Sequence, residues 1–193
     1  MAVLITGANG NVGRATIKAL ANRGIKPKAG VREVNYTHAY ADLVRFDFTD
    51  QESMRVALTD VDRVLLITPL DPRMVEYTKT FVAAAKDAGV KHIVKLSAYG
   101  AGEQEPITLG FMHRRAEEII EQSGIAWTHL RPNGFFQNFL GPLGDPVKRF
   151  HTLYLPLADT KVSYVDVLDI GEVAAVILSS TDHEGRIYDI TGP

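Results

Sequence analysis

The stretch "VLITGANGNVGRATIKAL", residues 3–20, decides the fold, because it joins a short apolar run to a helical pattern through three glycines. These are Gly7, Gly10 and Gly13, in the spacing G-x-x-G-x-x-G. Glycines after a first strand let the chain reverse sharply and let a pyrophosphate approach bare backbone. The helix that follows adds free N–H groups and a partial positive charge. The stretch predicts a dinucleotide at this turn, with an ordinary glycine turn as the alternative.

Apolar runs and helical patterns alternate along the rest of the chain. We predict strands at 3–6, 26–31, 43–46, 62–69, 90–98, 126–130 and 186–190, and helices at 12–23, 51–58, 74–88, 114–122 and 170–179. Such alternation implies right-handed crossovers and parallel strands. The sequence therefore predicts an α/β fold, a doubly wound parallel sheet of the Rossmann type. We expect one dinucleotide-binding domain over residues 1–193, in which 133–169 contribute the loops on the substrate side.

Composition excludes several classes of protein and of site. Lys and Arg are scattered and the net charge is −2, which argues against nucleic acid or a membrane surface as partner. The chain contains no cysteine, and its histidines lack metal-ligand spacing, so we predict no metal site. No apolar run reaches transmembrane length, and the N-terminus has no signal-peptide pattern. We expect a cytoplasmic protein.

Five segments carry a resemblance to a known family. They are "ITGANGNVG", "LLITPLDPRMVE", "AAKDAGVKHIVKLSAYGA", "RRAEEIIEQSGIAWTHLRPNGFFQN" and "KVSYVDVLDIGEVAA". Together they resemble the NmrA-like branch of the atypical short-chain dehydrogenase/reductases, over most of the chain and in the same order. This branch includes NAD(P)H:quinone and triphenylmethane-dye reductases as well as nucleotide-sensing regulators. Such proteins continue past the "YDITGP" position with helices that help to cover the substrate, so we expect that this lid is absent or comes from a partner subunit in a homodimer.

The end of the second predicted strand, "KAGVRE", bears on the choice of nucleotide. Arg32 stands where similar proteins meet the 2′-phosphate, and its guanidinium suits a phosphate in charge and shape. Glu33 offers a carboxylate to the ribose of NAD instead, and both charges in solvent are the third alternative. We favour NADP(H), with NAD(H) possible. The resemblance implies cofactor contacts from Gly7, Asn9, Gly10, Asn11, Val12, Gly13, Arg32, Asp47, Phe48, Thr68, Pro69, Ser97 and Pro132, although Asp47 also suits a turn or cap.

The groups that reduce ketones in short-chain dehydrogenases are a serine and a tyrosine–lysine pair four residues apart. The resemblance puts His113 at the lysine position and Leu109 at the tyrosine position, and leucine has no proton to give. No lysine lies between Leu96 and Val147. The remaining catalytic candidates are Ser97, Tyr99 and His113, while a merely packed histidine is an equal alternative for His113.

The absence of a tyrosine–lysine pair narrows the class of substrate that we expect. A ketone needs a proton as the hydride arrives, whereas a quinone, an azo compound or a cationic dye delocalises the electrons that it gains. A wall of Tyr99, Asn133, Phe135 and Phe136 would suit a flat aromatic acceptor. We predict an NAD(P)H-dependent oxidoreductase with a quinone-like, azo or dye acceptor, and a non-catalytic NADP-sensing regulator is the alternative. A sugar-nucleotide epimerase is a weaker third alternative, because epimerases depend on the tyrosine–lysine pair.

Overall fold

Seven parallel strands form the sheet of the computed structural model, which describes residues 1–35, 37–102, 108–140, 144–152 and 161–193. The strands are β1 (Val3–Ile5), β2 (Lys28–Val31), β3 (Asp42–Arg45), β4 (Arg63–Leu66), β5 (His92–Leu96), β6 (Ala126–Pro132) and β7 (Arg186–Ile190). Their order is β3-β2-β1-β4-β5-β6-β7, and each neighbouring pair is parallel. The predicted doubly wound Rossmann-type sheet is confirmed.

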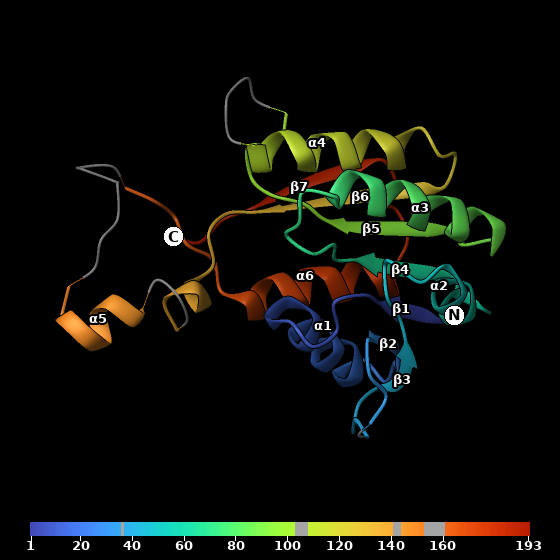
Figure 1. Ribbon diagram of the computed structural model, residues 1–193, viewed down its shortest axis with the longest axis horizontal. Helices are drawn as coiled ribbons and strands as arrows, with labels where there is room; N and C mark the ends of the chain where they lie inside the picture. Colours follow the sequence, from blue (N-terminus) through green and yellow to red (C-terminus); the bar gives the residue numbers. More distant parts are fainter. Residues whose placement is uncertain (36, 103–107, 141–143, 153–160) are drawn as a thin grey trace.

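Helices cover both faces of this sheet (Figure 1). The helices are α1 (Asn11–Asn22), α2 (Gln51–Leu58), α3 (Met74–Asp87), α4 (Thr108–Glu121), α5 (Asp145–Phe150) and α6 (Val167–Ser179), with a 3-10 helix η1 (Phe136–Leu140). Figure 1 shows α1 and α6 on one face and α2, α3 and α4 on the other. Each face buries an apolar layer, around Ile5 and Leu20 on the first and around Phe81 and Ile93 on the second.

Three expectations from the sequence need correction. The fourth helix begins at Thr108 rather than Arg114, because Phe111 in its first turns is 66% exposed and adds nothing to a buried stripe. The fourth strand ends at Leu66 rather than Pro69, and the fifth ends at Leu96 rather than Ala98, because the residues beyond them leave the ladder and line the ends of the sheet. The sixth strand instead continues to Pro132. η1 and α5 were not predicted, because neither has a buried face that would leave a periodic pattern.

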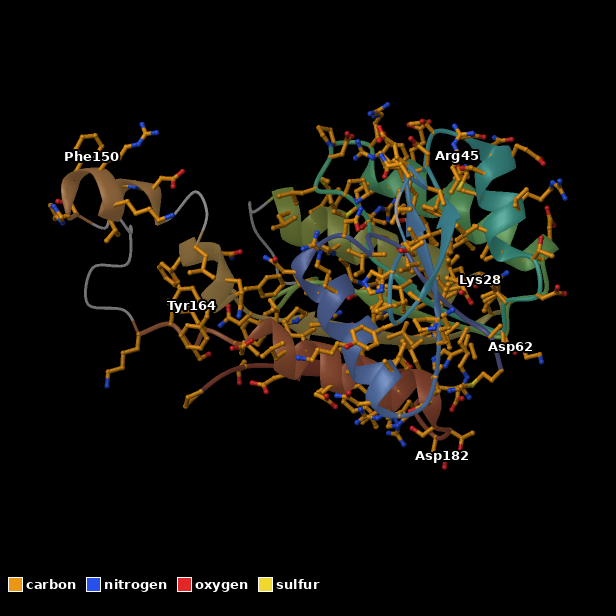
Figure 2. The ribbon with its side chains drawn as sticks, turned by 90° about the horizontal axis from the view of Figure 1, so that it is seen from below. Lys28, Arg45, Asp62, Phe150, Tyr164 and Asp182 are labelled. Carbon is orange, nitrogen blue, oxygen red and sulfur yellow. The ribbon has the colours of Figure 1, made fainter. Side chains whose placement is uncertain are left out.

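Helix α5 lies apart from the three layers, and Figure 2 shows Phe150 at its end, away from the body that carries Lys28 and Asp62. Of the predicted substrate-side segment 133–169, residues 141–143 and 153–160 lie outside the described residues. In the part of the chain that is described, no helix has the length and apolar character to cross a bilayer.

The strand order reverses between β1 and β4. From β1 the chain moves outward through β2 and β3, then returns to place β4 on the other side of β1. Thr6 ties the two carboxyl ends together, because its Oγ1 accepts from Ile67 N at 2.7 Å and lies 3.0 Å from Ile67 O. In open α/β sheets, ligands bind outside the strand ends at such a switch point.

Candidate functional site

A cavity of about 900 Å³ opens at the carboxyl ends of β1, β2 and β4, at the switch point of the sheet. Its walls come from the glycine turn and from the segments that follow β2, β3 and β4. It brings together these residues predicted to bind the cofactor: Gly7, Asn9, Gly10, Arg32, Asp47, Phe48, Thr68 and Pro69. The cavity therefore brings together, from four separate segments of the chain, residues that were predicted to bind the cofactor.

The glycine turn is shaped for an anion at the start of α1. Gly7 has a φ of 58°, a left-handed conformation, and its carbonyl accepts from Gly10 N at 2.9 Å. A Cβ on Gly13 would lie 2.5 Å from Gly7 O, so this position needs glycine for packing. A Cβ on Gly10 would meet only Gly7 O, at 3.2 Å, and would otherwise face open space. Gly10 is the N-cap of α1 and brings no side chain to cap it, which leaves the first N–H groups to a ligand.

The two residues after Gly10 contribute differently to this turn. Asn11 is exposed at the first position of α1. Val12 is buried against Val165, Val167 and Ile170, so only its backbone can face a ligand. The cradle fits a dinucleotide pyrophosphate, because it offers backbone N–H groups and the positive end of a helix rather than side chains.

The rim of the cavity beyond β2 carries both charges that bear on nucleotide choice. Arg32 and Glu33 are exposed and line the cavity, and Glu33 Oε2 accepts from Asn35 Nδ2 at 3.1 Å. The pKa of Asp47 lies below its ordinary value, first because Thr49 N and Oγ1 donate to it at 2.8 and 2.7 Å, and further because Arg32 lies near. Asp47 thus also stabilises the turn after β3, which is the alternative role that the sequence suggested for it.

The cavity also has an aromatic wall, formed by Phe46, Phe48 and Tyr77. The ring of Phe48 lies 5.5 Å from that of Tyr77, at 31°, and 4.9 Å from that of Phe46. The Arg73 guanidinium stands 5.0 Å over the Tyr77 ring and pairs with Asp71 at 3.1 Å. A flat base can stack on such a wall. Sequence reasoning missed Asp71, Arg73 and Tyr77, because a turn and a helix start hold such residues in any fold.

A buried lysine lies beneath Thr68, and the sequence reasoning missed it as well. Lys95 on β5 is 0% exposed, and its Nζ lies against Leu96 O, Thr68 Oγ1 (3.3 Å) and His113 Nδ1 (3.5 Å). The family resemblance places the catalytic lysine on the helix after β5, whereas Lys95 lies on β5 itself, one position before Leu96. Its signal was a lysine inside the apolar strand "HIVKL".

Burial changes the acid–base behaviour of this pair. It lowers the pKa of Lys95 to about 7, although the Glu117 carboxylate acts to raise it. Burial and, to a smaller extent, the neighbouring Lys95 charge lower the pKa of His113 to about 3. His113 is therefore a neutral imidazole at ordinary pH, which can accept from the Lys95 ammonium.

The other predicted catalytic residues lie away from the cavity lining. Ser97 is 5% exposed and lies near the buried Glu117 carboxylate, whose pKa its hydroxyl helps to lower. Tyr99 is 51% exposed and lines a second cavity of about 580 Å³, together with Trp127 and Arg131. Ser97, Tyr99 and His113 are thus not brought together around one reacting point, and their catalytic roles remain predictions.

Three residues of the predicted acceptor wall contact the segment 163–165, whereas Tyr99 lines the second cavity. Asn133 Nδ2 donates to Ser163 Oγ at 3.3 Å, next to the buried Pro132 that ends β6. Phe135 packs on the cluster around Val12. Phe136 is 49% exposed, with its ring 5.9 Å from that of Tyr164.

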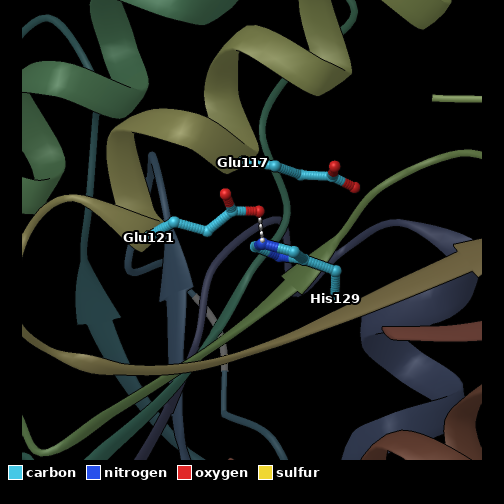
Figure 3. A group of neighbouring side chains, drawn as sticks. All are labelled: Glu117, Glu121 and His129. Atoms are coloured by element: carbon cyan, nitrogen blue, oxygen red, sulfur yellow. Dashed lines mark hydrogen bonds and ion pairs between the residues drawn. The ribbon is translucent and has the colours of Figure 1, made fainter. Parts of the chain in front are cut away.

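Glu117, Glu121 and His129 form a cluster with ligand-like spacing (Figure 3). Their lone pairs are already used. Arg131 Nη2 and Nε donate to Glu117 at 2.6 and 2.9 Å, and Arg114 binds Glu121 through two hydrogen bonds at 2.7 and 2.9 Å. Burial acts to raise the pKa of Glu117, but Arg131, Ser97 and His129 together outweigh it and the net shift is downward. Burial lowers the pKa of His129 to about 4, so a neutral His129 meets Glu121 Oε1 at 3.1 Å. This cluster is an ion-pair network between α4 and β6.

Similarities to known proteins agree with this geometry. The profile of the NAD(P)H-binding family matches residues 7–181. The chain is 31% identical to the NAD(P)H azoreductase of Xenophilus azovorans over 195 residues, which are 99% of this chain and 68% of that protein.

Two solved structures are also similar. The triphenylmethane reductase of Citrobacter sp. complexed with NADP(H) is 25% identical, with a TM-score of 0.87 over 100% of this chain and 70% of that one. The NADPH-dependent quinone oxidoreductase QOR2 of Escherichia coli, complexed with NADPH, is 28% identical, with a TM-score of 0.86 over 98% of this chain and 69% of that one. The chain thus spans about two thirds of the length of these relatives.

The predicted cofactor class, NADP(H) with NAD(H) possible, is confirmed by the family match and by these NADP(H)-bound relatives. The glycine turn, the seven-stranded parallel sheet and the similarity along nearly the whole chain show one origin. The chain belongs to the NAD(P)H-binding family, in the NmrA-like branch of the atypical short-chain dehydrogenase/reductases.

Proposed function

We propose that this chain is an NAD(P)H-dependent oxidoreductase that passes a hydride to a conjugated acceptor, such as a quinone, an azo compound or a dye. The observation that carries the proposal is the 900 Å³ cavity at the switch point, with its uncapped helix start and with Arg32 on its rim. The three relatives are named as azo, quinone and triphenylmethane-dye reductases, which supports this class of acceptor.

Different residues of the cavity hold different parts of the cofactor in our proposal. The bound nicotinamide supplies the hydride. In our proposal the backbone from Gly7 to Gly13 holds the pyrophosphate, Arg32 binds the 2′-phosphate, and Asp47 and Phe48 hold the adenosine half. Thr68 and Pro69, which follow β4, lie at the other end of the cavity, toward Ser97 and Pro132 at the ends of β5 and β6. Positioning then supplies most of the rate, because a conjugated acceptor delocalises the electrons that it gains.

The acceptor side of the site comes from the segment 133–169 in this proposal. Asn133, Phe135 and Phe136 contribute polar and aromatic surface, and the Phe136 and Tyr164 rings already lie together. A small aromatic or quinone-like molecule is the partner that such a surface fits. We also propose a homodimer, a cytoplasmic location, and no role for nucleic acid or membrane.

The proposal is tested by following NADPH absorbance with a panel of one benzoquinone, one azo dye and one triphenylmethane dye. We expect turnover with at least one acceptor, and faster reaction with NADPH than with NADH. Tight NADPH binding with no turnover on any acceptor would replace the enzyme with the nucleotide-sensing regulator. Failure to bind either nucleotide would overturn the assignment of the cavity.

A further inference from the structure

Lys95 is a buried cation without a carboxylate partner in the described part of the chain. Its Nζ has three neighbours, and all are uncharged: Leu96 O, Thr68 Oγ1 and the neutral imidazole of His113. Glu117 lies on the same side of the sheet, but Arg131 and Arg114 take up its carboxylate. A buried ammonium with only neutral partners costs stability, and a leucine or methionine would fill the same strand position without that cost. This cost points to a function for Lys95.

Thr68 connects Lys95 to the cofactor cavity. It follows β4 between Ile67 and Pro69, and all three line the cavity. A hydroxyl has one proton to donate and two lone pairs. When Thr68 Oγ1 accepts from the Lys95 ammonium, it keeps its own proton for a group inside the cavity.

We propose that Thr68 and Lys95 form a relay that delivers one proton to the reduced acceptor. This inference rests on the proposed reductase function. A quinone that receives a hydride still needs one proton on oxygen, and an azo group needs one on nitrogen. The Thr68 O–H bond breaks as the new O–H or N–H bond forms on the acceptor. An N–H bond of Lys95 then breaks to restore the Thr68 hydroxyl. After the product leaves, a proton from water in the cavity returns to the Lys95 amine through the Thr68 hydroxyl. Lys95 acts through Thr68 and is a positioning residue.

The surroundings of Lys95 suit the release of a proton. His113 and Glu117 face it from α4, and the His129 imidazole lies near from β6. Burial brings its pKa to about 7, near the pH at which an acid can both hold and give up a proton. The relay thus supplies, from β5, the proton that Leu109 on α4 has no group to give.

The acceptors themselves distinguish a proton relay from a structural role. Quinones and azo compounds take up a proton together with the hydride. A cationic triphenylmethane dye becomes neutral when it receives the hydride and needs no proton. Loss of the relay should therefore slow the first two reactions and spare the third.

The experiment compares Lys95→Met and Thr68→Val with Lys91→Met, a matched change at a lysine whose side chain is 76% exposed. We expect kcat for the quinone and azo dye to fall at least tenfold in the first two variants. In Lys95→Met the NADPH Kd and the rate with the triphenylmethane dye should change less than threefold. Thr68 also lines the cofactor cavity, so for Thr68→Val the measure is the ratio of the quinone and azo rates to the dye rate, which should fall at least tenfold. The parent kcat for the quinone should fall as pH rises above about 7, and Lys95→Met should lose this dependence.

A measurement without turnover tests the titration itself. The folded pKa of Lys95 lies below its ordinary value of 10.5, so the unfolded chain binds more protons between about pH 7 and 10.5. The parent and Lys91→Met should therefore become more stable to urea as pH rises through this window, by more than Lys95→Met does. Equal pH dependence in all three proteins would overturn the relay.

The remaining outcomes separate the two proposals. Equal losses on all three acceptors in Lys95→Met, or unchanged quinone and azo rates, would overturn the relay and leave the reductase standing. No turnover by the unmodified protein with any acceptor would overturn the reductase, and the relay with it. If Lys95→Met does not fold, Thr68→Val alone decides by the same comparison of acceptors.

Discussion

The two halves of the sheet differ in where they hold charged side chains. The charged or imidazole side chains that are buried in the described chain all lie on β5, α4 or β6; they are His92, Lys95, His113, Glu117 and His129. Around β1, β2 and β4 the buried layers are apolar, and the charges of Arg32 and Asp47 stay at the rim of the cavity. The first half offers a ligand its backbone, and the second half holds ionisable groups out of water.

This difference shows which changes each half should tolerate. A backbone cradle is sensitive to an added Cβ and indifferent to most side-chain chemistry. A buried charge network is sensitive to the loss of a single partner, because the remaining charge keeps its desolvation cost. Binding should therefore fail through glycine changes in the first half, and stability through charge changes in the second.

The largest effect is expected at Gly10. A leucine here would extend into the open space where the pyrophosphate is expected, because its Cβ meets only Gly7 O at 3.2 Å. We expect Gly10→Leu to abolish NADPH binding, measured by calorimetry, with a Tm close to that of the parent. Retained binding, or a large loss of Tm, would break the comparison by showing that Gly10 serves folding rather than the ligand.

A change at Arg131 tests whether the half of the sheet around β5 and β6 depends on its buried ion pairs for stability. Removing Arg131 leaves the fully buried Glu117 with Arg114 alone, so Arg131→Met should lower the free energy of unfolding by about 3 kcal/mol, measured in urea. The NADPH Kd should stay within twofold. The double variant Arg131→Met with Glu117→Met should recover much of the loss, because no unpaired charge then remains. A drop in nucleotide affinity would show that the two halves are coupled.

A change at Arg32 tests whether the rim of the cavity selects between NADPH and NADH. Loss of a charge-assisted phosphate contact should weaken NADPH by about 1.5–3 kcal/mol, roughly ten- to a hundredfold. Arg32→Ala should hardly change the Kd of NADH. The control is Arg55→Ala, at an exposed arginine of α2 that pairs with Glu52. Equal losses for both nucleotides would mean that Arg32 does not select between them.

The smallest effects are expected at Tyr99 and His113. Tyr99 faces the second cavity, and His113 is a neutral imidazole behind Lys95. Tyr99→Phe and His113→Ala should each keep the quinone reductase rate within roughly tenfold, short of the 10²–10⁴ of a true general acid. A thousandfold fall in Tyr99→Phe with unchanged NADPH affinity would make Tyr99 the acid in place of the relay.

The sequence predicted the parts of this molecule that depend on local pattern. Glycine spacing after a first apolar run indicated the turn, and the alternation of runs indicated the parallel sheet. The end of the fourth predicted strand and the start of the fourth helix were displaced, because residues 67–69 and Phe111 serve an edge or the surface rather than a buried stripe. The family resemblance pointed to Arg32, Asp47 and Phe48 on the cavity before any contact was visible.

By itself the sequence determined the fold class and the nucleotide-binding turn, since both follow from residue type and spacing along the chain. The family resemblance added that Leu109 stands where a tyrosine is expected. Only the tertiary structure decided that Tyr99 belongs to another cavity and that Tyr77 joins Phe48 in the wall of the first. It also decided that Lys95 lies beneath Thr68. The register of β4 and β5 and the position of α4 bring these residues together from distant parts of the chain. Burial, not composition, then sets how their charges behave.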